Sequence, residues 1–324
     1  MHSSSRFLCL LGLVSVALAQ STNQAGYNPR IGPSNANCTR QNYQLEITSN
    51  NMVFQNVDSN ANTFIGSGAN VCNNFVMYVY NDHLSTGLSE HPNDTYNVVQ
   101  ASTDLAIATK LLDMLKHGEI GGQQFDKVIG IGHSYGSVQI QALSATVPQM
   151  LDAVLLQGFS MNGHLLTSGA YSPATEVFPD RFNQSGLPST YLTTLAPQTQ
   201  QLNFWFFPYY SDAAFDHNRK TEQPVTQGVL FTQGGLMQNA TSFTGPVHVV
   251  TGANDWPFCF NDCYAVPANS TYTSIPEYVQ ELYPVTSNFS VYIPENTGHA
   301  VNAHYSAPDV YQEMLAFVSN VFGA

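Results

Sequence analysis

Short apolar runs alternate with longer amphipathic stretches between residues 75 and 322, and this alternation predicts the secondary structure. Apolar runs such as 75–80 and 153–156 are typical of strands that are buried on both faces. Between them, residues 97–117 repeat Val and Leu at a spacing near 3.6, which predicts an amphipathic helix that ends at Gly118. The predicted strands are 75–80, 128–131, 153–156, 246–250 and 289–293, and the predicted helices are 97–117, 137–143 and 308–321. Such alternation is typical of a parallel sheet with right-handed crossovers.

Residues 127–137 read Lys-Val-Ile-Gly-Ile-Gly-His-Ser-Tyr-Gly-Ser and join a predicted strand directly to a predicted helix. Ser134 is the centre of a Gly-x-Ser-x-Gly pattern in the strand–turn–helix context of a nucleophile elbow. Its oxygen would stand at a helix N-terminus, where the Tyr135 N–H could stabilise developing negative charge. The alternative is a glycine-rich turn with an incidental serine.

A serine nucleophile needs an adjacent base that is itself oriented by a carboxylate. Asp255 and His299 each follow a predicted strand, at the sheet edge where open parallel sheets build their sites. We therefore expect Ser134, His299 and Asp255 to act together in acyl transfer. Asp262 is the weaker candidate for the acid and His304 for the base. His133 should point away from the site and pack structurally.

In these motifs the chain resembles the α/β-hydrolase superfamily over about residues 75–322, and more narrowly the secreted serine hydrolases of filamentous fungi. The resemblance implies an α/β-hydrolase fold: a mostly parallel sheet with flanking helices and a cap after the sixth strand. Proline-punctuated residues 163–244 would form that cap. Residues 81–89 resemble the loop after the fourth strand, although Ser85 occupies the first glycine position. The aromatic run 204–210 would either pack the cap on the core or face a substrate with an apolar part.

The N-terminal part of the chain departs from this family pattern. The second oxyanion donor usually lies in a His-Gly loop after the third strand, yet no His-Gly precedes Asp82. Residues 55–56 (Gln-Asn) fall near that place but match poorly. Residues 20–74, with weak strand candidates at 43–47 and 52–54, are short for three strands and a helix. We therefore expect incomplete N-terminal strands and impaired activity in this chain.

Residues 1–19 have the features of an export signal: Arg6, an apolar stretch at 7–18 and the small-x-small site that precedes Gln20. The apolar stretch is short for a membrane span, so we expect a secreted hydrolase domain at 20–324 without a membrane anchor. Secretion also favours disulfides and N-glycosylation. The candidate glycosylation sites are Asn37, Asn93, Asn183, Asn239, Asn269 and Asn288.

Four cysteines remain beyond this signal, which predicts two disulfides with three possible pairings. Cys259–Cys263 with Cys38–Cys72 is favoured, because the first two cysteines lie only four residues apart. A zinc site at Cys259 and Cys263 is the rival, but no suitably spaced second pair supports it.

The formal net charge of −13 argues against nucleic acid as a partner. No metal-binding, phosphate-binding or dinucleotide-binding motif is present, so no cofactor is expected. The resemblance and the serine at the elbow disfavour epoxide hydrolases and haloalkane dehalogenases, which use an aspartate there. The sequence predicts a secreted serine hydrolase for a small carboxylic ester, lactone or thioester. The alternatives are a catalytically impaired, ligand-binding relative and a tailoring hydrolase of a secreted natural product.

Overall fold

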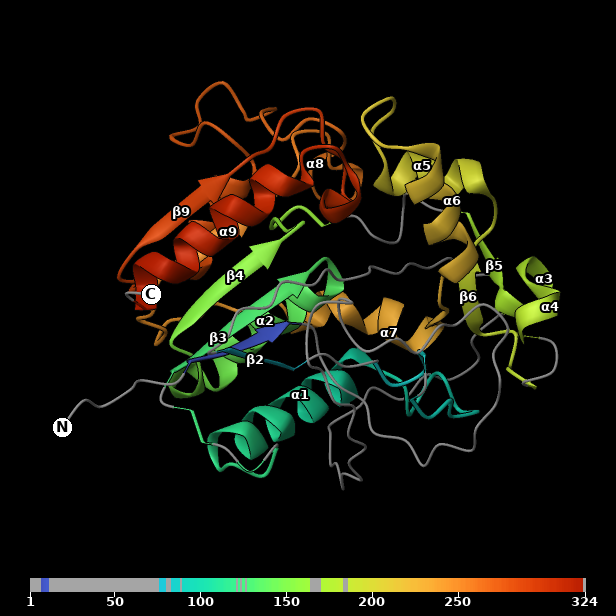
Figure 1. Ribbon diagram of the computed structural model, residues 1–324, viewed down its shortest axis with the longest axis horizontal. Helices are drawn as coiled ribbons and strands as arrows, with labels where there is room; N and C mark the ends of the chain where they lie inside the picture. The colour runs from blue at the N-terminus through green and yellow to red at the C-terminus, as the bar shows by residue number, and fades with distance from the viewer. Residues whose placement is uncertain are drawn as a thin grey trace.

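A six-stranded sheet forms the centre of the molecule (Figure 1). A computed structural model describes residues 7–11, 76–79, 83–87, 89–120, 122, 124–125, 127–163, 170–182 and 186–322. The sheet strands, in spatial order, are β2 (Val76–Val79), β1 (Phe7–Leu11), β3 (Lys127–His133), β4 (Ala153–Gln157), β8 (Val247–Val250) and β9 (Phe289–Tyr292). Every neighbouring pair is parallel. This confirms the predicted fold class.

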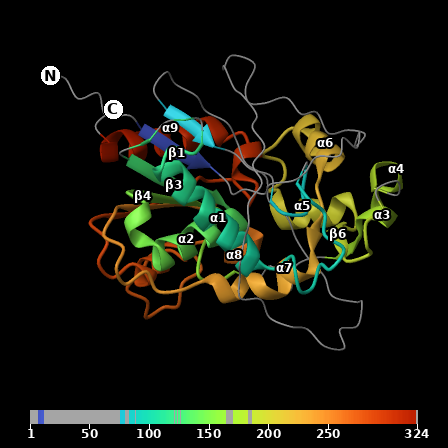
Figure 2. The ribbon, with the colours of Figure 1, turned by 90° about the horizontal axis from the view of Figure 1, so that it is seen from below.

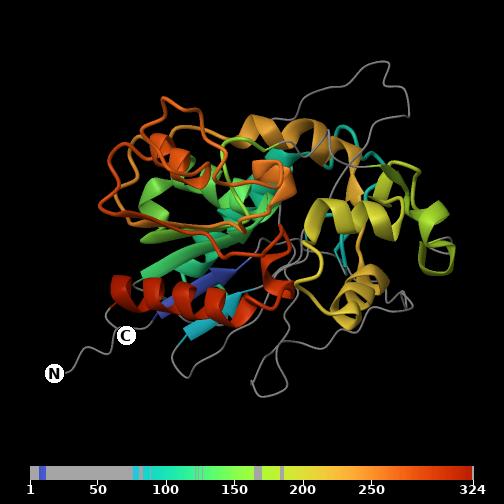
Figure 3. The same ribbon diagram turned by 90° about the horizontal axis from the view of Figure 1, so that it is seen from above.

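Side chains of the central strands alternate between two apolar layers, as the period of two along a strand requires. On β3, Val128 joins the layer that includes α1 (Ala101–Lys116) and α2 (Tyr135–Thr146), whereas Ile129 packs in the layer of α9 (Ala307–Phe322). Figures 2 and 3 show α9 on the opposite face of the sheet from α1 and α2. The continuous apolar runs of the sequence therefore reflect burial on both faces.

The predicted end of the first helix is also confirmed. Helix α1 ends at Lys116, His117 follows as its C-cap, and Gly118 has a φ of 75°. This is the left-handed conformation that glycine adopts without a Cβ clash. His117 therefore belongs to a helix end, as expected.

Strand β1 was not predicted as a strand, because its residues lie inside the predicted export signal. It pairs with β2 on one side and with β3 on the other. The structure is that of the chain with residues 1–19 still attached, so cleavage after Ala19 stays a prediction. A chain cleaved there would lack β1. The strand candidates at 43–47 and 52–54 lie outside the described residues, as do residues 55–56, Cys38 and Cys72.

The cap contains a small antiparallel sheet that the sequence analysis did not predict, because each of its strands has only two to four residues. The order is β5 (Tyr171–Pro173), β6 (Tyr191–Thr194) and β7 (Val225–Thr226). Its helices are α3 (Ala174–Val177), α4 (Pro179–Phe182), α5 (Pro197–Phe204) and α6 (Asp212–Thr221). In Figure 1 the arrows of β4 and β9 point toward the cap side of the molecule, so the cap lies beyond the carboxyl ends of the strands.

The remaining elements connect the cap to the core or lie in the loops of the core. Helix α7 (Gln227–Thr232) packs against α1, and Thr232 Oγ1 accepts a hydrogen bond from Ala101 N at 2.9 Å. The short helices are α8 (Trp256–Cys259), η1 (Pro148–Met150), η3 (Gln233–Leu236), η4 (Pro276–Leu282) and η5 (Val301–Ala303). In the part of the chain that the structure describes, no helix combines the length and apolarity needed to cross a membrane.

Candidate active site

The turn between β3 and α2 places Ser134 in a strained backbone conformation. Its φ of 56° and ψ of −121° are unusual for a residue with a Cβ, and such strain persists only where the surroundings enforce it. Gln157 O, at the end of β4, accepts hydrogen bonds from Ser134 N and Ser137 Oγ, both at 2.8 Å. These bonds hold the turn against the sheet.

The two glycines of the elbow differ in what they contribute. A Cβ on Gly132 would lie 2.3 Å from the carbonyl carbon and oxygen of Gly136, so no side chain fits there. A Cβ on Gly136 would meet nothing within 4 Å. Only the first glycine is therefore required by close approach of strand and helix.

Ser134, His299 and Asp255 form a continuous hydrogen-bonded chain. The Ser134 hydroxyl faces His299 Nε2 at 2.7 Å, and His299 Nδ1 lies 2.7 Å from Asp255 Oδ2. A carboxylate only accepts, so Nδ1–H donates to it and leaves Nε2 as the acceptor for the serine proton. The exposed fractions of the serine, the histidine and the aspartate are 0%, 1% and 0%, so bulk water does not screen these contacts.

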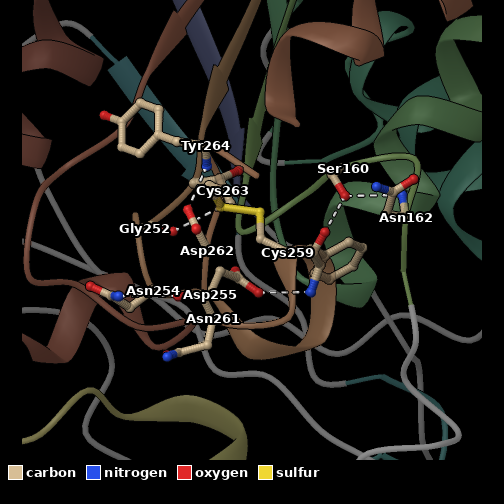
Figure 4. The surroundings of a disulfide bond; sticks show 12 residues. Ser160, Asn162, Gly252, Asn254, Asp255, Cys259, Asn261, Asp262, Cys263 and Tyr264 are labelled. Atoms are coloured by element: carbon tan, nitrogen blue, oxygen red, sulfur yellow. Dashed lines mark hydrogen bonds between the residues drawn. A yellow bond between two sulfur atoms is a disulfide. The ribbon is translucent and has the colours of Figure 1, made fainter. Parts of the chain in front are cut away.

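The acid is held by the start of helix α8. Asp255 is the N-cap of α8, and its Oδ1 accepts a hydrogen bond from Phe258 N at 2.8 Å, which leaves Oδ2 for His299. Figure 4 shows that the disulfide between Cys259 and Cys263 closes the loop directly after this residue. The structure thus joins the pair of cysteines that the sequence favoured.

His304 bonds to backbone groups around His299 and contacts neither Ser134 nor Asp255 through a hydrogen bond that the structure records. Its Nε2 accepts hydrogen bonds from Phe206 N at 2.9 Å and Gly298 N at 3.1 Å, while Nδ1–H donates to Ala300 O at 2.9 Å. It therefore ties the loop around His299 to the cap. Asp262, the weaker acid candidate, is exposed, and its Oδ1 accepts from Tyr264 N.

The expectation for His133 was wrong, because its ring lies beside the site. The ring centroids of His133 and His299 are 5.0 Å apart. Gly158, at the end of β4, makes room for both imidazoles, since its Cβ would lie 3.0 Å from His299 Cε1 and 3.1 Å from His133 Cε1. Burial and the nearby His299 lower the pKa of His133 to about 3, so this imidazole is neutral near pH 7.

Tyr135 is the first residue of α2, so its N–H precedes the internal hydrogen bonds of that helix and remains available as an oxyanion donor. Its phenol donates to Asp104 Oδ2 at 2.8 Å. The loop after β2 contributes His83, whose ring lies beside the Tyr135 ring with the centroids 5.4 Å apart. His83 Nδ1 is 4.0 Å from Asp104, and Ser85 has a φ of 80°, a conformation that suits the glycine expected at that position.

A cavity of about 120 Å³ lies between His299 and the cap. The sequence left open whether the aromatic run 204–210 packs the cap on the core or faces the substrate, and the structure shows residues of both kinds. Phe204 and Trp205 line the cavity, Tyr210 packs against Trp205 and His304, and Phe207 is 68% exposed. The lining residues are His133, Tyr171, Thr194, Gln200, Phe204, Trp205, Asn218, Thr221, Glu222, Gln223, His299 and Ala300.

The described residues contain no cluster of three or more His, Cys, Asp and Glu side chains that could hold a metal ion. Asn93, Asn239, Asn269 and Asn288 are exposed, whereas Asn37 and Asn183 lie outside the described part of the chain. Exposure makes these four sequons accessible, and it leaves their modification a prediction.

Comparisons with known proteins give similarity in fold only. No protein-family model and no curated protein sequence matches the chain. Among solved structures, the methylesterase MES16 from Arabidopsis is 15% identical, with a TM-score of 0.48 over 75% of this chain and 87% of its own. A monoacylglycerol lipase from Paleococcus ferrophilus is 13% identical, with a TM-score of 0.44 over 72% of this chain and 78% of its own. An α/β-hydrolase fold protein from Chitinophaga pinensis is 18% identical, with a TM-score of 0.43 over 73% and 77%.

Proposed function

We propose that the protein is a serine hydrolase that cleaves a small carboxylic ester, or a lactone or thioester, through an acyl-enzyme on Ser134. The observation that carries this proposal is the hydrogen-bonded chain from Asp255 through His299 to Ser134, with 2.7 Å at both links. An isolated serine hydroxyl is a poor nucleophile at neutral pH, so a buried base in contact with it has a direct chemical use.

In the proposed reaction, His299 Nε2 takes the proton of Ser134 as Oγ attacks the substrate carbonyl carbon. The Tyr135 N–H donates a hydrogen bond to the oxyanion of the tetrahedral intermediate. His299 then returns the proton to the leaving group, and the acyl group stays on Ser134. A water molecule, deprotonated by the same nitrogen, releases the acid. Asp255 stabilises the imidazolium in both halves of the reaction and takes up no proton itself.

The cavity beside His299 limits the size of the substrate group that it can hold. An apolar cavity of about 150 Å³ holds one benzene molecule, so about 120 Å³ has room for a small group of four to six heavy atoms. The two aromatic side chains Phe204 and Trp205 supply apolar contact. Short-chain esters are therefore the substrates that this cavity favours.

A panel of p-nitrophenyl esters with acyl chains of two to ten carbons tests this function. We expect kcat/KM to be highest for chains of about four carbons and to fall beyond six. Replacing Ser134→Ala should lower kcat by about 10³-fold or more. Ser287→Ala, at an exposed serine before the amino end of β9, is the matched control and should leave the rate unchanged. Equal turnover by wild type and Ser134→Ala would contradict the proposal.

We also propose that the protein is an exported glycoprotein. The support is the signal-like segment 1–19 together with the exposure of the four described sequons. The disulfide between Cys259 and Cys263 is consistent with an oxidising compartment.

A further inference from the structure

The wall of the cavity that belongs to the cap is a network of buried polar side chains around Glu222. The carboxylate accepts from Thr194 N at 2.7 Å, from Thr194 Oγ1 at 2.8 Å and from Gln200 Nε2 at 3.1 Å. It also pairs with the Arg219 guanidinium. Glu222 and Arg219 are 6% and 13% exposed in their side chains. Such a network is costly to bury unless each member has partners, so these side chains are held in place.

Gln200 is oriented by two acceptors. Its Nε2 donates to Asn218 Oδ1 at 2.7 Å as well as to Glu222, and both of these partners accept from an amide N–H₂. A flip of the Gln200 amide, which exchanges its oxygen and nitrogen, would therefore break both hydrogen bonds. The side-chain oxygen of this amide, Gln200 Oε1, takes part in neither hydrogen bond.

In the cap wall of the cavity, Gln200 Oε1, an acceptor, and Trp205 Nε1, a donor, lack a hydrogen-bond partner among the residues that the structure describes. On the core side of the cavity, His133 Nδ1 lacks one as well. Gln200 is 2% exposed and Trp205 is 5% exposed, so bulk water does not satisfy either atom. Native proteins leave few buried polar groups without partners, and each exception needs an explanation.

We propose that this cavity binds a hydroxyl group of the substrate, which donates to Gln200 Oε1 and accepts from Trp205 Nε1. The proposal rests on the proposed esterase function and names its substrate class: an ester whose short acyl or alcohol part carries a hydroxyl. A hydroxyl both donates and accepts through one atom, which suits one free acceptor and one free donor.

The wall offers no free counter-charge to an ionised substrate group. A carboxylate or an ammonium group would lose its hydration on entering the cavity without gaining an ion-pair partner there. The Glu222–Arg219 pair neutralises itself. The neutral imidazole of His133, which also lines the cavity, adds no charge. A neutral hydroxyl is therefore the polar group that this wall accepts.

Two matched pairs of esters test the proposal. One pair is p-nitrophenyl 3-hydroxybutyrate and p-nitrophenyl butyrate, and the other is 2-hydroxyethyl butyrate and propyl butyrate. We expect a preference of about tenfold in kcat/KM for the hydroxylated member of one pair, and that pair identifies the side of the ester that enters the cavity. Gln200→Leu and Trp205→Phe should each reduce this preference to threefold or less. The preference is the ratio of kcat/KM for the two members of a pair, so a change that affects both esters equally cancels.

Gln198→Leu is the matched control, because it makes the same change at an exposed position of helix α5. It should retain the wild-type preference. If wild type hydrolyses all four esters without preference, or if both cavity variants retain the preference, the hydroxyl site is wrong while the hydrolase function stands. If wild type hydrolyses none of the four, the proposed function fails and the hydroxyl site fails with it.

Discussion

Asp255 uses both of its carboxylate oxygens, and this shows how single residues assemble the site. One oxygen caps helix α8 through Phe258 N, and the other orients His299. The same residue thus fixes a helix start and the tautomer of the base. His299 is constrained on its other side by the Ser134 hydroxyl. These residues are far apart in the sequence, and they meet because each follows the carboxyl end of a strand at the same edge of the sheet.

Asp104 is the buried carboxyl whose charge state should affect stability. Burial raises the pKa of Asp104 from 3.8 to about 7, opposed by the hydrogen bond from Tyr135. Between these two pH values the folded protein holds a proton that the unfolded chain has lost. The contribution of Asp104 to the free energy of unfolding therefore falls as pH rises from about 4 to about 7.

The prediction is that Asp104→Asn becomes more stable relative to wild type as pH rises through this window, by about 1.4 kcal/mol for each pH unit at most. Burial also lowers the pKa of His83 to about 4, which makes the contribution of His83 rise with pH. Since His83 lies 4.0 Å from Asp104, the variant and its reference are both compared in a His83→Gln background, where this contribution is absent. Urea unfolding at pH 4.5 and 7.5 measures the difference in free energy of unfolding between Asp104→Asn and its reference. If this difference does not change with pH, the carboxyl of Asp104 is not buried as the structure has it.

At the scale of elements, His304 joins the loop of His299 to the cap. Replacing His304→Phe would leave the N–H groups of Phe206 and Gly298 without an acceptor, at about 1–3 kcal/mol each. We expect a loss of about 2–4 kcal/mol in the free energy of unfolding and a fall in kcat.

His304→Gln is the matched variant, because the glutamine Oε1 can accept the two hydrogen bonds that His304 Nε2 accepts in the wild type. It should recover much of both losses. Chemical unfolding and steady-state kinetics measure the two effects. If Phe and Gln at this position behave alike, His304 does not act through these hydrogen bonds.

The disulfide between Cys259 and Cys263 closes a short loop, so it removes little entropy from the unfolded chain. We expect the double variant Cys259→Ser with Cys263→Ser to lose less than the roughly 3 kcal/mol of a 15-residue loop. Its kcat should fall more clearly, because the loop holds Asp255. Chemical unfolding and steady-state kinetics on the same preparation measure the loss of stability and the fall in kcat. Peptide mapping that finds both thiols free in exported wild-type protein would contradict the bridge.

At the scale of the whole molecule, the segment Phe7–Leu11 cannot both stay in the sheet and be removed with an export signal. Phe7–Leu11 forms the strand between β2 and β3, and the same residues form the core of the predicted export signal. After cleavage, β3 would lose the neighbour that separates it from β2. An unpaired strand edge exposes backbone groups and promotes aggregation.

We predict that the secreted protein begins at Gln20 and that this form is less stable and less soluble than the full chain. N-terminal sequencing of secreted protein tests the first part. Thermal unfolding of the full chain and of a chain that starts at Gln20, both produced without export, tests the second. Equal midpoints and equal solubility for the two would show that β1 adds nothing to the folded protein.

The sequence predicted the core better than the cap or the N-terminal part, for physical reasons. Strands such as β3 and β4 are short, mostly apolar runs. Gly132, two residues before Ser134, marks the elbow because it stands between a predicted strand and a predicted helix. Phe7–Leu11 was ambiguous, because a short apolar run after Arg6 suits a strand and an export signal equally well.

The cap cavity gave no signal in the sequence. Gln200 and Glu222 belong to polar stretches that read as ordinary surface, and only the folded cap turns them inward. His133 was misplaced because the neighbour of Ser134 in sequence was expected to point away from the site. The backbone leaves the strand geometry at Ser134, and the His133 ring lies beside His299. Long-range packing decides such positions, and no local pattern records it.

Labelling with a fluorophosphonate probe, followed by peptide mass spectrometry, tests the central claim most directly. The account predicts one covalent adduct, on the peptide that contains Ser134. Ser134→Ala should abolish the adduct, and His299→Ala should slow its formation by about 10²-fold or more because the base is lost. Ser287→Ala should label like wild type. A folded wild-type protein that never labels, or labelling that persists in Ser134→Ala, would contradict the account.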